Sequence, residues 1–105
     1  MPREIVHDEA ARTYRLLDED GAVLSHTDYR LVDPTGADAP AGGDDAVIVF
    51  HHTYTVPAQR GNGYAEEVVR AALDDVRRRS AQAAATCWFV DDFIRSHPEY
   101  ADLVA

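Results

Sequence analysis

The chain has 105 residues, a formal net charge of −9 and a single cysteine, Cys87. This length predicts one domain, residues 1–105, with room for one modest core. The acidic balance argues against nucleic acid and anionic membranes as partners, because both present negatively charged phosphates. A lone cysteine excludes an internal disulfide and a cysteine-based metal cluster, and we expect no metal site. The first residues contain no apolar signal segment, so we expect a cytoplasmic protein.

The first part of the chain predicts antiparallel strands. A short apolar start at residues 5–6 precedes two β-compatible runs, residues 12–18 and 22–32, which are joined by the turn sequence Asp-Glu-Asp-Gly. Side chains alternate between the two faces of a strand, so every second residue of the later run should point to the core. We expect these core-facing residues to be Val23, Ser25, Thr27, Tyr29 and Leu31.

A long loop and a buried strand follow. Residues 33–45 hold two Pro and three Gly, a composition that predicts a loop. Residues 46–50 form a continuous apolar run, which is typical of a strand that is covered on both faces. This strand should continue to Val56, because Pro57 cannot donate a hydrogen bond to a neighbouring strand.

The remainder predicts a helix, a strand and a second helix. Apolar residues recur at spacings of three and four over residues 65–76, which predicts an amphipathic helix. Residues 83–87 favour a short strand, and residues 89–94 predict a helix that Pro98 stops. We expect the aromatic residues, Trp88 among them, to lie in the core. The predicted order is three or four antiparallel strands, a helix, a strand and a helix, which is an α/β fold.

The turn before the first helix, Arg60-Gly61-Asn62-Gly63, combines a basic residue with two glycines. A helix N-terminus has unpaired N–H groups and a partial positive charge, and glycines let a ligand approach the backbone closely. These features favour a pyrophosphate site. Two phosphate motifs do not fit: the P-loop requires Lys after the second Gly and the dinucleotide fingerprint requires Gly at position 66, where the chain has Tyr64 and Glu66.

A third pattern, Arg/Gln-x-x-Gly-x-Gly/Ala, does fit, through Arg60, Gly63 and Ala65. It resembles the coenzyme A pyrophosphate loop of the GNAT N-acetyltransferases. Two longer blocks resemble the small, minimal GNAT-like family: HHTYTVPAQRGNGYAEEVVRAALDD and CWFVDDFIRSHPEYADLV. That family carries a His-Thr strand end, a Pro, this loop and a C-terminal block that begins with Cys. The resemblance covers residues 50–104, about half of the chain.

The resemblance implies a mostly antiparallel sheet with a splayed central pair of strands and two main helices. Acetyl-coenzyme A, the acyl donor, would lie in the cleft between the splayed strands, with its pyrophosphate on the turn. An amine would attack the thioester directly, and a backbone N–H at the strand kink would hold the oxyanion. The cofactor-binding residues implied are Thr53, Tyr54, Thr55, Arg60, Gly61, Asn62, Gly63, Tyr64 and Ala65.

Direct transfer needs a base for the amine proton and an acid for the departing thiolate. Adjacent residues of a strand face opposite sides, so one of His51 and His52 should lie near the cleft, and His52 is the candidate base. Cys87 should end the strand beside the thioester and could donate a proton or accept an acyl group. The alternative for Cys87 is a buried structural role. Some members of the small family have Glu where this chain has Tyr54, which makes Tyr54 the third candidate.

One departure from the family leaves two functions open. Many larger GNAT enzymes place an acidic Tyr on the last helix, where this chain offers Phe89 and Phe93. The missing Tyr favours a non-catalytic acyl-coenzyme A-binding or interaction module, whereas Cys87 and His52 favour an acetyl-coenzyme A-dependent N-acetyltransferase. The acceptor would be an amine of a small molecule or of a partner protein, and the acidic surface suits a cationic amine.

Overall fold

The chain forms a five-stranded sheet in a computed structural model that describes residues 3–33, 35–39 and 46–105. Part of the predicted loop, Pro34 and residues 40–45, lies outside the described residues. The strands lie in chain order, β1 to β4 antiparallel and β5 parallel to β4. This mostly antiparallel α/β arrangement confirms the predicted fold class. The strands are β1 (Glu4–Asp8), β2 (Thr13–Leu17), β3 (Val23–Val32), β4 (Val47–Thr55) and β5 (Gln82–Ala85).

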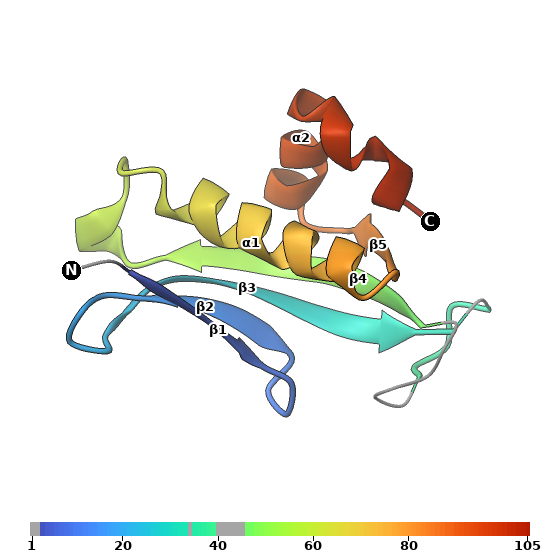
Figure 1. The fold of residues 1–105 in the computed structure, drawn as a ribbon, viewed down its shortest axis with the longest axis horizontal. Coiled ribbons are helices and arrows are strands. Elements are labelled where there is room, and N and C mark those ends of the chain that lie inside the picture. Colours follow the sequence, from blue (N-terminus) through green and yellow to red (C-terminus); the bar gives the residue numbers. More distant parts are fainter. Residues whose placement is uncertain (1–2, 34, 40–45) are drawn as a thin grey trace.

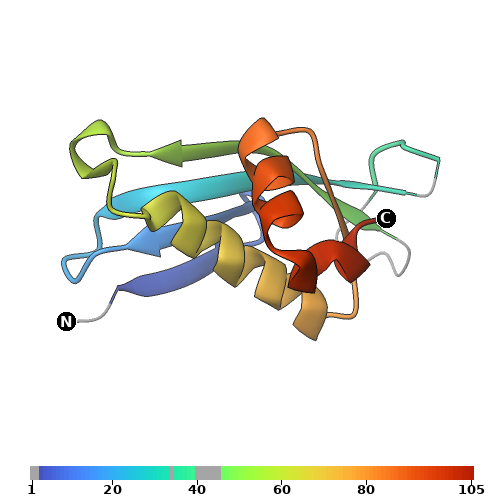
Figure 2. The same cartoon turned by 90° about the horizontal axis from the view of Figure 1, so that it is seen from above.

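Two α-helices cover one face of the sheet. Figures 1 and 2 show α1 (Tyr64–Arg78) and α2 (Trp88–Ser96) on the same side, with α1 crossing the sheet and α2 standing beside β5. Short 3-10 helices follow β4 at Pro57–Gln59 and α2 at Pro98–Leu103. The opposite face carries no helix within the described residues. None of the described helices is long and apolar enough to cross a membrane.

The core forms where α1 packs against the sheet. The apolar spacing predicted from the sequence places five α1 residues against β2, β3 and β4, each at most 1% exposed. They are Val68, Val69, Ala72, Leu73 and Val76. On the sheet side, this cluster is completed by three equally buried residues, Tyr14, Leu16 and Phe50. Burial of each Val or Leu side chain contributes roughly 1.5–3 kcal/mol, so this contact fixes α1, and with it the turn before α1, on the sheet.

The predicted alternation in β3 is correct in its middle and wrong at its start. Ser25 and Thr27 are completely buried, as predicted, but Val23 is 37% exposed and Leu24 is buried. The register with β2 shifts here: Ser25 pairs with Leu16, and Val23 pairs with Leu17. Leu24 is therefore the extra residue of a β-bulge, which shifts the side-chain alternation by one position.

A polar network joins β1, β2 and β3 to α1 away from the turn. His7 Nε2 lies 2.6 Å from the Tyr29 hydroxyl, and Arg79 donates to His7 Nδ1 over 3.0 Å. Tyr14 and Arg79 both donate to Asp75 over 2.7 Å. Burial and the nearby Arg79 guanidinium lower the pKa of His7. Burial raises the pKa of Asp75, but the hydrogen bonds from Tyr14 and Arg79 outweigh burial and hold it below its ordinary value.

We predict that His7 makes the fold less stable in mild acid. Because the pKa of His7 is lowered in the folded chain, the unfolded chain binds the proton better, and stability falls as the pH drops below about 6.5. Urea unfolding of His7→Gln should lose less stability between pH 7.5 and pH 5.5 than the parent chain. His51→Gln, which removes an exposed histidine, is the matched control. An unchanged pH dependence in His7→Gln would contradict the assignment.

Candidate functional site

The central pair of strands parts after Phe50. Val47 to Phe50 pair with Gln82 to Ala85 in parallel register. The N–H groups of Thr86 and Cys87 then both donate to the Phe50 carbonyl, over 3.0 and 3.2 Å, so the second strand turns away. For this reason the strand predicted over residues 83–87 ends at Ala85. β4 continues to Thr55 with no strand on this edge in the described part of the chain, which confirms the expected splay.

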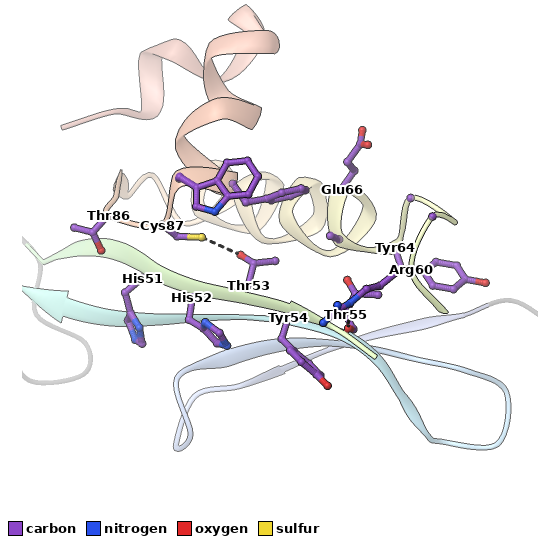
Figure 3. A pocket seen from close by; sticks show the side chains of 15 residues that line it. His51, His52, Thr53, Tyr54, Thr55, Arg60, Tyr64, Glu66, Thr86 and Cys87 are labelled. Carbon is purple, nitrogen blue, oxygen red and sulfur yellow. Dashed lines mark hydrogen bonds between the residues drawn. The ribbon is translucent and has the colours of Figure 1, made fainter. Parts of the chain in front are cut away.

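A cleft of about 800 Å³ lies where the strands part. This volume lies within the usual range for a ligand site. One wall is the open edge of β4, the second is the segment that leads into α2, and the end is the turn before α1 (Figure 3). The lining residues are His51, His52, Thr53, Tyr54, Thr55, Arg60, Gly61, Gly63, Tyr64, Ala65, Glu66, Thr86, Cys87, Trp88 and Phe89.

The N-terminus of α1 is left uncapped at the end of the cleft. Gly63 is the N-cap residue, with φ 78°, and provides no side-chain cap. Gly61 also has a positive φ, 90°, so both glycines adopt backbone conformations that other residues rarely take. The first intrahelical bond runs from the Glu67 N–H to the Gly63 carbonyl, over 3.0 Å. The three preceding N–H groups therefore have no intrahelical acceptor, as at any helix start, and they carry partial positive charge.

Arg60 and Asn62 both bond to backbone within the turn. Arg60 donates from Nε to the Thr55 carbonyl over 3.1 Å, and its guanidinium lies 5.7 Å from the centre of the Tyr54 ring. Arg60 is exposed and lines the cleft, so its terminal nitrogens are available to an anion there. Asn62 donates to the Gln59 carbonyl over 3.0 Å and is not among the lining residues. Asn62 therefore stabilises the turn.

Cys87 lines the cleft and is the N-cap residue of α2. Its thiol donates to the Thr53 hydroxyl over 3.6 Å (Figure 3). This hydroxyl lies 3.0 Å from that of Thr27. Thr27 is completely buried, so the chain of hydrogen bonds connects the thiol to the interior of the sheet. Cys87 itself is half-buried and reachable from the cleft.

The prediction that His51 and His52 face opposite sides is wrong. In the register between β3 and β4, Asp28 pairs with His52 and Tyr29 with Phe50, so His51 is an extra residue. This bulge turns both rings to the same side, and both residues are exposed. Figure 3 shows these rings on the side of β4 opposite to Cys87, so the cleft is lined there by the strand itself.

The aromatic residues divide between cleft and core. Trp88, predicted to be buried, is 77% exposed, because it is the first residue of α2 and lines the cleft instead of facing the core. Phe89 also lines the cleft, whereas Phe93 is buried and stacks on His97 with ring centres 3.9 Å apart. Sequence reasoning did not assign Thr86, Trp88 or Phe89 to the site. Their position next to Cys87 in the sequence was the signal that could have assigned them to the cleft.

The geometry agrees with the comparison to known families. A family described as GCN5-related N-acetyl-transferase matches residues 14–103. The chain belongs to this family. A GCN5-related fold is also seen in solved structures: a GCN5-like protein from Staphylococcus aureus has a TM-score of 0.62 at 20% identity, covering 97% of this chain and 87% of that chain.

Two further relatives extend the comparison. The aminoglycoside N-acetyltransferase AAC(6')-Iy, solved in complex with CoA, has a TM-score of 0.51 at 15% identity, covering 84% of this chain and 57% of that chain. At such identities the likeness concerns the fold alone. Protein NATD1 of Bos taurus is 35% identical over 52 residues, which are 50% of this chain and 46% of NATD1. The match thus spans about half the length of this relative.

Two isosteric substitutions test the turn as an anion site. Asn and Asp tolerate positive φ better than other residues, so Gly63→Asn and Gly63→Asp should strain the backbone equally. They differ by one negative charge. If the turn holds the pyrophosphate, Gly63→Asp should bind coenzyme A at least about tenfold more weakly than Gly63→Asn in calorimetry. Pantetheine, which lacks the pyrophosphate, should bind both alike. Equal coenzyme A affinity of the two variants would contradict the assignment of the pyrophosphate to this turn.

Proposed function

We propose that the chain is an acetyl-coenzyme A-dependent N-acetyltransferase that transfers the acetyl group directly to an amine. The observation that carries the proposal is one continuous cleft, which runs from the parted strands to the uncapped start of α1. An elongated ligand with an anionic middle and a thioester end matches such a cleft. The CoA complex of a structural neighbour supports the same donor.

In this proposal the donor is held mainly by backbone groups. The pyrophosphate accepts hydrogen bonds from N–H groups of the turn and the first turn of α1, and the Arg60 guanidinium adds charge. The pantetheine arm follows the open edge of β4, which has no partner strand among the described residues there. The residues assigned to donor binding are Thr53, Tyr54, Thr55, Arg60, Gly61, Gly63, Tyr64 and Ala65. Asn62 acts through the shape of the turn.

The reaction has one covalent step before product release. The neutral amine nitrogen attacks the thioester carbonyl carbon, so that a C–N bond forms and the C–S bond breaks. The electron pair of that bond leaves on sulfur, the nitrogen loses one proton to a base, and the thiolate takes one proton from an acid. A backbone N–H at the His51 bulge stabilises the negative carbonyl oxygen in between. His52 is the proposed base, so in this proposal the amine reaches the thioester from the side of β4 that carries the His52 ring.

Cys87 is the proposed acid. Its thiol lines the cleft beside the open edge of β4 and donates a hydrogen bond to the Thr53 hydroxyl in the resting state. An acid at this point would protonate the departing thiolate of coenzyme A. Since no Tyr stands on α2, and Phe93 is buried, Cys87 is the residue of the cleft wall suited to replace it.

The second candidate is a non-catalytic binder of acyl-coenzyme A. Two observations favour it: α2 lacks a Tyr, and both histidine rings of β4 lie on the side opposite to Cys87. The two functions differ in one observable, because only the transferase converts an added amine into its N-acetyl derivative. The single-domain extent of residues 1–105, a cytoplasmic location and a protein partner stay predictions.

The thiol provides a direct test of the transferase. Cys87 is the only cysteine, so iodoacetamide reports on this site alone, and acetyl-coenzyme A should slow its alkylation. Cys87→Ala should keep donor affinity, measured through the fluorescence of the sole tryptophan, Trp88, and lower the rate of N-acetyl product formation by about a hundredfold. Cys87→Ser, which replaces the thiol by a hydroxyl that can still donate a proton, should lower this rate less. An alkylation rate that acetyl-coenzyme A does not lower, or full turnover in Cys87→Ala, would contradict the role of Cys87 as the acid.

A further inference from the structure

A forked ion pair ties the segment before β1 to the first turn of α1. Arg3 donates from Nε to both carboxylate oxygens of Glu67, over 3.0 and 3.2 Å, and its Nη2 lies 2.8 Å from Oε1. The same guanidinium lies 5.0 Å from the centre of the Tyr64 ring. Tyr64 is the first residue of α1 and lines the cleft, so this one side chain contacts Arg3 and the cleft alike.

β1 runs beside α1 in the same direction, and this packing brings Arg3 to the start of the helix (Figure 2). Hydrogen bonds join the two elements at both ends. Arg3 bonds to Glu67 near the start of α1, and His7 accepts from Arg79 just past its end. β1 is the edge strand of the sheet opposite to β5. The strand furthest from the parted pair therefore places a cation beside the turn at the end of the cleft.

The start of α1 needs added cations if it is to hold an anion. A helix start carries a positive charge of roughly half a unit. Glu66 and Glu67 bring two negative charges to the first turn, and Glu66 also lines the cleft. The two carboxylates therefore more than cancel the partial charge of the helix. Arg60 in the turn and Arg3 on Glu67 return two positive charges, so that a small positive excess is restored at this end of the cleft.

The ion pair itself contributes little to folding. The side chains of Arg3 and Glu67 are 43% and 37% exposed, and exposed ion pairs stabilise a folded chain only weakly. The buried apolar residues of α1 are what hold the helix on the sheet. A pyrophosphate carries more than one negative charge, so its attraction to Arg3 and its repulsion by Glu67 are each larger than those of a single charge. The pair therefore matters more for binding an anion than for stability.

We propose that Arg3 is a positioning residue of the donor site, which acts by neutralising Glu67 beside the pyrophosphate. The inference rests on the proposed function, in which coenzyme A places its pyrophosphate on the turn before α1. Arg3 is not among the residues that line the cleft, so its effect passes through Glu67 and Tyr64. The fork keeps the Glu67 carboxylate paired, and the cation over Tyr64 holds a ring that forms part of the cleft wall.

Opposite charge changes on the two partners test the inference. Coenzyme A binding is measured by calorimetry in the parent chain, Arg3→Gln, Glu67→Gln and the double variant. At low salt Arg3→Gln should bind roughly threefold more weakly, Glu67→Gln roughly threefold more tightly, and the double variant like the parent. Each single change breaks the same ion pair, so a purely structural role would weaken binding in both. Weaker binding by Glu67→Gln than by the parent would overturn the proposal.

Matched measurements separate this local effect from the net charge of the chain. Arg3→Lys keeps the charge and should bind nearly as well as the parent. Arg95→Gln removes the same charge from an exposed ion pair with Asp91 on α2 and should change little. The loss in Arg3→Gln should shrink at about 0.5 M salt, and pantetheine, which lacks the pyrophosphate, should bind all variants alike. Equal losses in Arg3→Gln and Arg95→Gln, or in Arg3→Gln and Arg3→Lys, would refute the role of the Arg3 charge.

Failure of the inference and failure of the proposed function look different. Equal coenzyme A affinity in the parent chain and in Arg3→Gln would reject the role of Arg3 and keep the donor site. Absence of coenzyme A binding in the parent chain would reject the transferase, and inorganic pyrophosphate is then the probe. Its affinity, read from the backbone amide NMR signals of residues 61–65, should be lower in Arg3→Gln than in the parent. Equal pyrophosphate affinity in both, or no binding in the parent, would overturn the inference as well.

Discussion

The parting of β4 from β5 is the constraint on which the site depends. One acceptor, the Phe50 carbonyl, receives the N–H groups of both Thr86 and Cys87 and so ends the parallel pairing. Within the described residues β4 continues to Thr55 paired with β3 alone, which leaves its other edge able to pair with a ligand in place of a strand. An open edge is a risk in a folded protein because it can pair with another chain. In this chain the cleft, the turn and the start of α2 surround it.

A single inserted residue divides the site between the two sides of the sheet. The bulge at His51 sends the rings of His51 and His52 to the sheet face that no described helix covers, while Thr53 stays beside Cys87. The burial of α1 on the sheet fixes the end of the cleft, since the same helix begins at the turn from Arg60 to Gly63. This division suits a short chain that has only two α-helices in its described part.

The sequence predicted the elements better than it predicted the directions of side chains. The period of α1, the turn from Arg60 to Gly63 and the antiparallel strands all follow local patterns that tertiary structure does not override. The two bulges were not predictable, because an extra residue reverses the alternation without changing the composition. Trp88 was misplaced for a similar reason, since exposure depends on which side of α2 meets the cleft. Arg3 was visible as a basic residue, but its contact with Glu67 required the packing of β1 along α1.

The central claim is that acetyl-coenzyme A occupies the cleft between the parted strands and reaches the start of α1. A titration of the isotope-labelled chain with acetyl-coenzyme A, followed through backbone amide NMR signals, tests it most directly. We expect saturable shifts concentrated in residues 51–55, 60–66 and 86–89, with β1 and β2 unchanged. Saturable shifts confined to other parts of the chain, or no shifts at all, would contradict it.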